Sequence, residues 1–299
     1  MKLVVTGGAG FIGSHLVESL VSNKYDVTVV DNSTNLNFNN LQSIKDKIEF
    51  NNLDILDYEI LKKSLKNADC VFHHAALTSV QDSFTQQQKY TDVNVKGTEN
   101  IFKIAQEYGF KVIFASSAAI YGNTKQIPIK EESITHPINP YGETKLKSEK
   151  LSEFYAKKGV SITGLRYFNV YGPRQNKTYA GVITKFLEMI KNKKPLTIHG
   201  DGFQTRDFVF VGDVVEANLL AMKSSVNHAL INIGSGIATS INELADMIMQ
   251  LSGLKIDPIH DDALEGEIRS SQADIGLAKS LLDWMPKTRL ESWLEQVIL

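Results

Sequence analysis

The sequence predicts an α/β fold, a doubly wound parallel sheet with a smaller α/β lobe attached, and three observations lead to this prediction. A glycine-rich turn directly follows the first apolar run of the chain. Apolar, β-branched runs then alternate with amphipathic helical patterns through the first half, which is typical of a parallel sheet with helices on both faces. In the second half the elements are shorter and Gly/Pro-rich turns separate them, which indicates the additional lobe.

The N-terminal segment has the order of a dinucleotide-binding βαβ unit. Residues 3–5 form one apolar run, and residues 27–30 form a second that ends on Asp31. Between them, glycines allow the backbone to bend sharply and approach a pyrophosphate, which the N-terminus of a helix over 11–22 would stabilise. Asp31 would accept both ribose hydroxyls and repel a 2′-phosphate, so NAD is predicted in preference to NADP. The alternative is an ordinary glycine turn between strand and helix. The glycines of this turn are Gly7, Gly8, Gly10 and Gly13.

The remaining elements follow in chain order. After strands at 3–6 and 27–30, we expect strands at 48–53, 70–73, 111–116 and 161–167, with helices at 58–65, 92–108 and 141–157. In the second half we expect helices at 180–193, 214–224, 241–251 and 273–282, and strands at 196–199 and 229–233. We therefore assign residues 1–167 and about 208–235 to an NAD-binding domain, and about 168–207 and 236–299 to a substrate-binding lobe.

Composition and charge exclude several classes of protein. Hydrophobic residues make up 42% of the chain, enough for a sizeable core, and a net charge of −2 gives no basis for a nucleic-acid or anionic-membrane partner. No apolar run has membrane-spanning length, and because the chain enters a strand directly we expect no signal sequence. The single cysteine, Cys70, cannot form an internal disulfide, so a cytoplasmic location is expected. His73 and His74 are adjacent on a predicted strand and would face opposite sides, so no metal site is expected.

One tyrosine–lysine pair has the setting of a catalytic site. The pattern Tyr-x-x-x-Lys occurs three times, so its spacing alone decides nothing. Only Tyr141 and Lys145 follow a proline-rich entry (HPINPYGETK) into a long helical stretch, where the two side chains share one face. Only this pair also has a candidate partner, Ser117, at the carboxyl end of a core strand, where open α/β sheets bind ligands. The other pairs are Tyr58/Lys62 and Tyr121/Lys125.

These residue types suit the removal of a proton from an alcohol. A free tyrosine hydroxyl has a pKa near ~10 and is a weak base at neutral pH, but a neighbouring lysine and a positively charged nicotinamide ring would favour the phenolate. Ser117 can hydrogen-bond the reacting oxygen as hydride leaves the same carbon. The alternative is structural: Tyr141 as a half-buried helix tyrosine and Ser117 as a cap at the end of a strand.

Seven segments carry a resemblance to a known family. They are GGAGFIGSH, Asp31-Asn32, HHAA, SSAAIYG, PYGETK, LRYFNVYGPRQ and TRDFVFVGDV. In this order they resemble the extended short-chain dehydrogenases/reductases, and most closely the UDP-glucose 4-epimerase (nucleotide-sugar epimerase) family, over nearly the whole chain. The resemblance implies a Rossmann domain, a nucleotide-sugar-binding lobe, and NAD retained through turnover. It also implies a homodimer through a four-helix interface at 93–108 and 146–155, although these apolar positions are equally well core positions.

The resemblance implies a set of cofactor and substrate contacts. Ser117, Tyr141 and Lys145 would be catalytic. The implied cofactor contacts are Gly7, Gly10, Phe11, Ile12, Gly13, Asp31, Asn32, Asp54, Ile55, Ala75, Asn94, Tyr141 and Lys145. The implied substrate contacts are Ser117, Asn169, Arg206, Arg269 and Ser271.

Four positions refine the substrate that the resemblance implies. Arg206 would pair with the diphosphate; the alternative is a local pair with Asp207 or Asp201. Relatives carry an arginine two residues before Gly266, where this chain has Leu264, and either Arg269 compensates or the loop is shifted. Ser271 matches the position whose size decides whether an N-acetyl group fits, and its small side chain leaves room for one.

The resemblance favours epimerisation over elimination. Sugar-nucleotide dehydratases and glucuronate decarboxylases carry a glutamate two residues after the catalytic serine or threonine, where this chain has Ala119. The expected activity is therefore the interconversion of UDP-glucose and UDP-galactose, extended to UDP-N-acetylglucosamine. The alternatives are a UDP-glucuronate 4-epimerase, a sugar-nucleotide dehydratase or other net oxidoreductase, and a catalytically idle nucleotide-binding protein.

Overall fold

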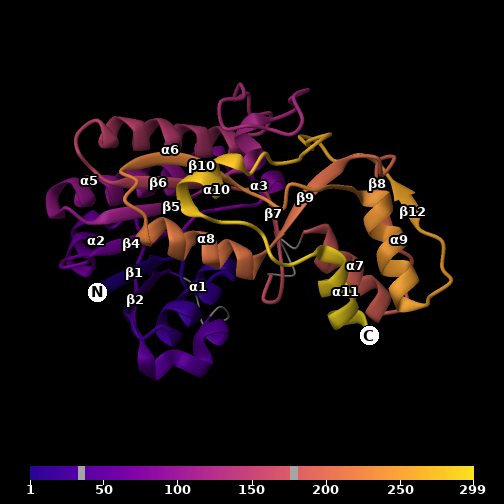
Figure 1. The fold of residues 1–299 in the computed structure, drawn as a ribbon, viewed down its shortest axis with the longest axis horizontal. Helices are drawn as coiled ribbons and strands as arrows, with labels where there is room; N and C mark the ends of the chain where they lie inside the picture. Colours follow the sequence, from indigo (N-terminus) through magenta and orange to yellow (C-terminus); the bar gives the residue numbers. More distant parts are fainter. Residues whose placement is uncertain (33–37, 176–180) are drawn as a thin grey trace.

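A seven-stranded parallel sheet forms the larger part of the molecule, whose residues 1–32, 38–175 and 181–299 are described by a computed structural model (Figure 1). Its strand order is β10-β6-β5-β4-β1-β2-β3, so the order in which strands are added to the sheet reverses between β1 and β4, where open sheets of this kind bind ligands. The strands are β1 Lys2–Thr6, β2 Asp26–Asp31, β3 Glu49–Asn52, β4 Cys70–His73, β5 Lys111–Ser117, β6 Ile162–Tyr167 and β10 His228–Ile233.

Helices cover both faces of this sheet because its strands are apolar on both sides. Along β1, Leu3 and Val5 pack into one core with α1 (Phe11–Ser22), whereas Val4 packs into the opposite core. The first core also holds α8 Val211–Lys223 and α10 Gly276–Leu282, and the second holds α2 Tyr58–Ser64, α5 Thr98–Tyr108 and α6 Pro140–Ala156. Short helices complete this part: η1 Phe38–Lys47, α3 Val80–Thr85, α4 Gln87–Thr91, η2 Asp92–Gly97 and η3 Ala118–Tyr121.

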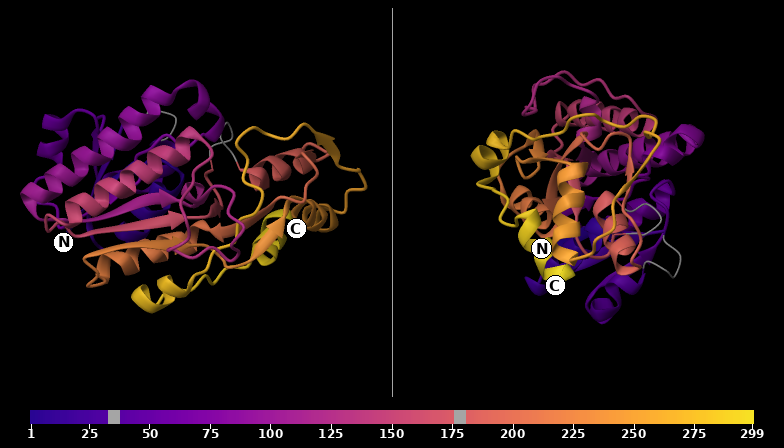
Figure 2. Two further views of the ribbon diagram at one scale, coloured as in Figure 1. Left: turned by 90° about the horizontal axis from the view of Figure 1, so that it is seen from above. Right: turned by 90° about the vertical axis from the view of Figure 1, so that its right-hand side faces the viewer.

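A smaller lobe lies beyond the carboxyl ends of the central strands and has its own core (Figure 2). Its sheets are short: β11-β9-β7 in one and β12-β8 in the other. Strands β7 Asn169–Tyr171, β8 Thr197–His199, β9 Thr205–Phe210, β11 Ala238–Ser240 and β12 Ile259–Asp261 pack with α7 Val182–Lys191, α9 Ile241–Ser252 and α11 Leu290–Ile298. The segment 262–275, which we call the strap, runs back from this lobe to the central sheet.

The parallel sheet predicted from the sequence is confirmed, and the differences lie in the second half. Residues 276–284 were assigned to the small lobe, but Ala278, Leu282 and Trp284 pack in the core of the central sheet. Strand β9 pairs with β7 and β11, and it contributes to both cores: Phe208 packs in that of the small lobe and Val209 in that of the central sheet. The helix expected at 180–193 begins at Val182, and Ala180 lies outside the described residues.

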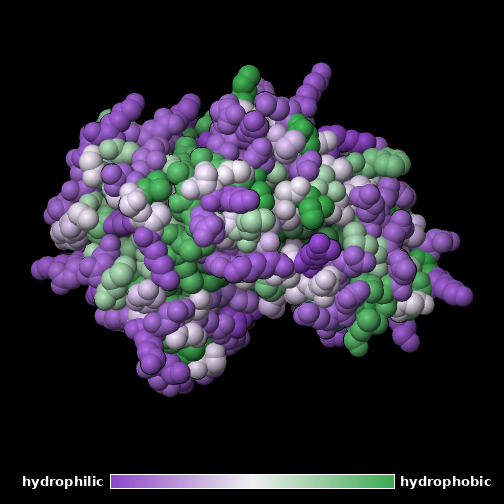
Figure 3. All heavy atoms as spheres, viewed as in Figure 1, coloured by the Kyte–Doolittle hydropathy of each residue, from purple (hydrophilic) through white to green (hydrophobic). Residues whose placement is uncertain are grey.

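The surface is mostly hydrophilic, with apolar groups over α8, α10 and α11 on the face seen in Figure 3. Leu281, Met285 and Val297 are among the partly exposed apolar side chains of this region. Among the described helices, none is long and apolar enough to cross a membrane.

Candidate active site

The glycine turn brings β1, β4 and α1 into close contact. Gly7 has a φ of +68°, and a Cβ there would lie 2.6 Å from the amide nitrogen of Ala75, just beyond β4. A Cβ at Gly13 would lie 2.2 Å from the carbonyl oxygen of Gly7. Only glycine permits this turn to fold so closely onto its helix. Gly10 caps α1, so Phe11 and Ile12 form its first turn, and backbone N–H groups at the helix start lie at the carboxyl edge of the sheet.

Four of the predicted cofactor contacts lie together at the ends of β2 and β3. The Asp31 carboxylate accepts a hydrogen bond from the amide of Ala9 at 2.9 Å, which ties the end of β2 to the glycine turn. Asn32 donates to the Asp54 carboxylate at 2.8 Å, and the buried Ile55 follows directly. This arrangement places a carboxylate beside the glycine turn, as the sequence predicts.

Asn94 holds a loop in place at this edge. Its amide nitrogen donates to the carbonyl of Leu77 at 2.9 Å and to the Thr144 hydroxyl at 3.0 Å, and its oxygen accepts from the Leu77 amide at 2.8 Å. Asn94 therefore fastens the loop after β4, which includes Ala75, to helix α6. A direct contact of Asn94 or Ala75 with the cofactor stays a prediction.

The structure brings Ser117, Tyr141 and Lys145 together. Ser117 ends β5 and Tyr141 lies in the first turn of α6, and the Ser117 hydroxyl acts to lower the pKa of Tyr141. Asn139 caps this helix and Pro140 is its first residue, which explains why it begins immediately before Tyr141. Lys145, one turn later, has its ammonium 5.9 Å from the centre of the Tyr141 ring.

The other two Tyr-x-x-x-Lys pairs lie elsewhere. Lys62 makes an ion pair with Glu107 at 2.7 Å on the outer surface of α2, away from the glycine turn. Tyr121 is buried and donates a hydrogen bond to Asn232 at 2.7 Å. The setting of Tyr141 in the sequence therefore distinguished the pair at the sheet edge from these two.

The arginines predicted to bind substrate are paired with carboxylates. Arg206 on β9 contacts Glu267 at 2.7 Å, whereas the expected local partners Asp207 and Asp201 are engaged elsewhere. Arg269 in the strap binds Asp201 through two hydrogen bonds, of 2.7 and 2.9 Å. The partner of Arg206 is 61 residues away in sequence, which is why local spacing missed it.

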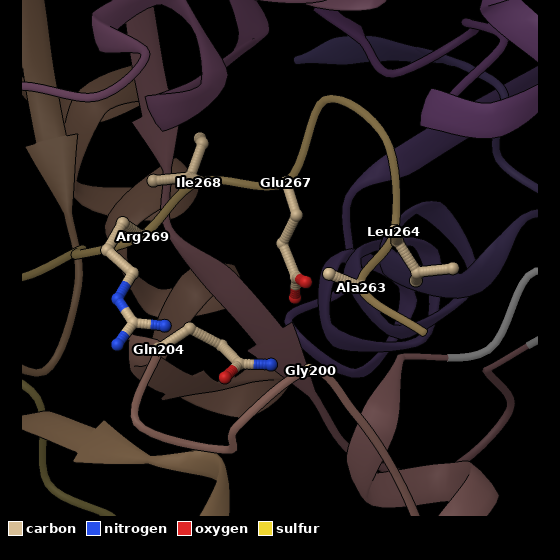
Figure 4. Close-up of a pocket in the computed structure, with 7 residues that line it drawn as sticks. All are labelled: Gly200, Gln204, Ala263, Leu264, Glu267, Ile268 and Arg269. Atoms are coloured by element: carbon tan, nitrogen blue, oxygen red, sulfur yellow. The ribbon is translucent and has the colours of Figure 1, made fainter. Parts of the chain in front are cut away.

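Glu267 and Arg269, but not Arg206, line a pocket in the small lobe (Figure 4). Glu267 projects toward Ala263 and Gln204, while the Leu264 side chain points away from it. Leu264 is 39% exposed, so the position expected to hold an arginine presents an apolar side chain. The full lining is Gly200, Gln204, Ala263, Leu264, Glu267, Ile268 and Arg269.

Asn169 and Ser271 both lie beside β9. Asn169 is the exposed first residue of β7, which pairs with β9. Ser271 is buried in the strap, and its amide donates to the Thr205 hydroxyl at 3.3 Å. Their contacts with a substrate stay predictions.

A family model described as the NAD dependent epimerase/dehydratase family matches residues 3–234. The chain belongs to this family.

Its relatives act on nucleotide sugars. The chain is 42% identical, over 99% of its length and 97% of the relative's, to a putative UDP-glucose 4-epimerase of Methanocaldococcus jannaschii. It superposes on the UDP-glucose 4-epimerase of Thermotoga maritima, solved with UDP-glucose, with a TM-score of 0.94 at 40% identity, covering 100% of this chain and 97% of that one. The UDP-glucuronic acid 4-epimerase of Bacillus cereus, solved with UDP-glucuronic acid and NAD, has a TM-score of 0.92 at 34% identity, covering 99% and 97%.

The epimerase family depends on NAD, and the edge of the sheet fits this cofactor. The turn has no Cβ at Gly7 or Gly13, where one would collide with backbone, and the α1 N-terminus offers N–H groups to a pyrophosphate. Asp31 lies where the second strand ends, as required for a carboxylate that accepts ribose hydroxyls. When bound, NAD supplies a nicotinamide ring that accepts and returns hydride. Among residues 1–32, 38–175 and 181–299, no cluster of three His, Cys, Asp or Glu could hold a metal.

Burial and charge shape the acid–base properties of this epimerase-family site. Burial raises the pKa of Tyr141, and its hydrogen bond with Ser117 opposes that rise. Burial lowers the pKa of Lys145 to about 8, with Glu149 opposing the shift. Burial also lowers the pKa of His73 to about 3 and that of His74 to about 4, so both imidazoles are neutral at pH 7. At neutral pH, the Lys145 ammonium is thus largely protonated, and it lies 5.9 Å from the centre of the Tyr141 ring.

Proposed function

We propose that the protein is an NAD-dependent UDP-glucose 4-epimerase that interconverts UDP-glucose and UDP-galactose by transient oxidation at C4. The observation that carries this proposal is the cluster of Ser117, Tyr141 and Lys145 at the carboxyl edge of a sheet that fits NAD. A group that removes a proton from an alcohol must first lie within reach of that proton. These three side chains come together at one point of that edge.

Each side chain has a role in the proposed reaction. Tyr141, as the phenolate, accepts the proton of the sugar 4-hydroxyl while the hydrogen on C4 leaves as hydride. Ser117 donates a hydrogen bond to the oxygen as it becomes a carbonyl. Lys145 stabilises the phenolate by its charge and is itself fixed by donating to the carbonyl of Ala115 at 2.8 Å. The 4-keto sugar then turns in the pocket, receives the hydride on its other face and regains its proton from Tyr141.

Ala118 and Ala119 support epimerisation over elimination. They follow Ser117 in the short helix η3, and Ala118 is buried. Elimination of water from the sugar requires an acid beside the reacting carbons to protonate the departing hydroxyl. Two alanines at this point provide none.

The pairing of the arginines supports a neutral sugar over a uronate. A carboxylate at C6 of a uronate would need a cation or several donors in the buried site. Four of the chain's five arginines already contact carboxylates of the protein. They are Arg166, Arg174, Arg206 and Arg269. Binding of the diphosphate at Arg206 would itself require exchange with Glu267.

The small, buried Ser271 supports an extension of this activity to UDP-N-acetylglucosamine. A homodimer through α5 and α6 is part of the same proposal. Phe154 on α6 is 51% exposed and would be covered in such an interface. Sedimentation of the purified protein would give a dimer mass, whereas a monomer at assay concentrations would remove this part of the proposal.

The proposal is tested by incubating the purified protein, without added cofactor, with UDP-glucose, UDP-N-acetylglucosamine and UDP-glucuronate separately. NMR of the sugar anomeric region distinguishes gluco- from galacto-configured products. We expect UDP-galactose from UDP-glucose, no accumulation of a ketone, and no change in the near-ultraviolet absorbance of reduced nicotinamide. Conversion of UDP-glucuronate alone would transfer the function to the glucuronate epimerases, and accumulation of a keto sugar would favour a dehydratase.

A further inference from the structure

A buried ion pair lies directly behind the cluster of Ser117, Tyr141 and Lys145. Glu149 on α6 and Arg166 on β6 contact each other through two parallel hydrogen bonds, both of 2.9 Å. Their side chains are 3% and 6% exposed. Removing two charges from water is costly, and such a pair adds little to stability over well-packed apolar residues. Its presence beside the site therefore calls for a role other than stability.

The pair completes a row of contacts between α6 and the last three residues of β5. The Ser117 hydroxyl acts to lower the pKa of Tyr141, Lys145 donates to the carbonyl of Ala115, and Glu149 accepts from the Ser116 hydroxyl at 2.5 Å. Residues 141, 145 and 149 are one helical turn apart and share one face of α6. Ser116 is paired in register with Arg166 on the neighbouring strand, so the same carboxylate joins α6 to β5 and β6.

The network continues toward the substrate side of the molecule. Arg166 also donates to the Tyr121 hydroxyl at 2.7 Å, which donates in turn to the amide oxygen of Asn232. The Asn232 amide nitrogen donates to the carbonyl of Ile129 at 2.9 Å, and residue 129 bridges to Ala273 in the strap. Every link in this chain is a buried hydrogen bond with ordinary length.

We propose that Glu149 and Arg166 are positioning residues, which hold α6 in register against β5 and balance each other's charge beside Tyr141 and Lys145. This rests on the catalytic roles proposed above. The Glu149 carboxylate serves both purposes. It accepts a hydrogen bond from Ser116, which fixes α6 against β5, and its negative charge offsets that of Arg166.

The charges around Lys145 make this second function measurable. Glu149 raises the pKa of Lys145, while His73 and His74 on β4 are neutral at pH 7. The acids on the other elements packed against α6 have their own lysine partners: Asp92 pairs with Lys96, and Glu99 with Lys103. Asp82 lies in the first turn of α3, where the helix N-terminus favours a negative charge. Arg166 also interacts with Glu131, whose carbonyl accepts a hydrogen bond from it at 2.8 Å. Loss of Glu149 would therefore remove the carboxylate that Arg166 contacts directly and make the charge near the site more positive.

The test compares three single variants and one double variant by the pH dependence of kcat and by thermal unfolding. Glu149→Gln keeps the shape and a hydrogen bond to Ser116 but removes the charge. We expect both limbs of its pH profile to move to lower pH by about one unit, because a net positive charge favours phenolate and neutral amine. Ser116→Ala should lower kcat about tenfold through a loosened α6 without moving the profile. Glu149→Gln with Arg166→Gln removes both charges and should return the limbs to the wild-type positions.

Glu153→Gln is the matched control, because Glu153 is an exposed acid one turn further along the same helix. It should match the wild type in kcat, profile and melting temperature. The proposal is overturned if Glu149→Gln leaves the profile in place or moves it to higher pH, or if Ser116→Ala keeps full kcat. A wild-type protein with no epimerase activity on any of the three substrates would instead refute the proposed function, so the two failures are distinguishable.

Discussion

Replacing Tyr141 by phenylalanine removes the proposed base and leaves almost everything else in place. The ring stays in its partly buried position, and the backbone amide of residue 141 still donates to the Ser83 hydroxyl, at 3.2 Å in the wild type. Loss of the hydroxyl should change the free energy of unfolding by no more than about 1 kcal/mol, which corresponds to about 2–4 °C in melting temperature for a chain of this size. General-base catalysis contributes about 10²–10⁴-fold, so kcat should fall by that factor, about 3–5 kcal/mol in activation free energy.

The assay follows UDP-galactose formation from UDP-glucose at pH 7.5 or so, with melting curves recorded on the same preparations. Tyr58→Phe is the matched control, because Tyr58 also precedes a lysine by four residues but lies on α2. It should keep wild-type turnover. If Tyr141→Phe retained more than about a tenth of the wild-type kcat with an intact fold, Tyr141 would not be the base.

Four further outcomes are expected. Ser271→Tyr should abolish turnover of UDP-N-acetylglucosamine and spare UDP-glucose; an equal fall for both substrates would show that residue 271 does not control access at C2. Leu264→Arg should lower the KM for UDP-glucose about three- to tenfold with kcat unchanged, because an added guanidinium beside the pocket pairs with the diphosphate in ground and transition states alike. Asp31→Asn should weaken NAD binding about tenfold or more and reduce the ratio of the affinity for NAD to that for NADP. Both affinities are measured by titration after removal of bound cofactor. The pKa of His73 is about 3 in the fold against an ordinary 6.5, so the unfolded chain takes up the proton first and stability falls as pH drops below 6.5. In urea titrations between pH 7 and 5, His73→Asn should reduce this slope by up to about 1.4 kcal/mol per pH unit; an unchanged slope would contradict the assignment.

The central sheet could be predicted from sequence because its signals are local. Each strand is buried on both faces and reads as an apolar run, as in Leu3–Val5, and the glycines of the first turn have no other use than close approach of backbone. The start of α6 could also be predicted from neighbouring residues, because Asn139 and Pro140 mark it.

The small lobe and the pairing of its charges could not be predicted in the same way. Strands β7 and β11 are three residues long, and they exist because β9 lies between them. The pair of Arg206 with Glu267 joins residues 61 positions apart, which no periodicity encodes. Glu149 could have been recognised from the sequence, because an acid one turn after Lys145 on the inward face of a helix needs a cationic partner. Arg166, which supplies it, lies in the motif LRYFNVYGPRQ.

The central claim, reversible oxidation at C4 with return of the same hydride, is tested most directly with UDP-glucose that carries deuterium at C4. The purified protein is incubated with it in ordinary water without added cofactor, and the UDP-galactose formed is analysed by NMR and mass spectrometry. The account predicts that the deuterium stays on C4 of the product. Loss of the label to water, or its transfer to C6, would contradict it.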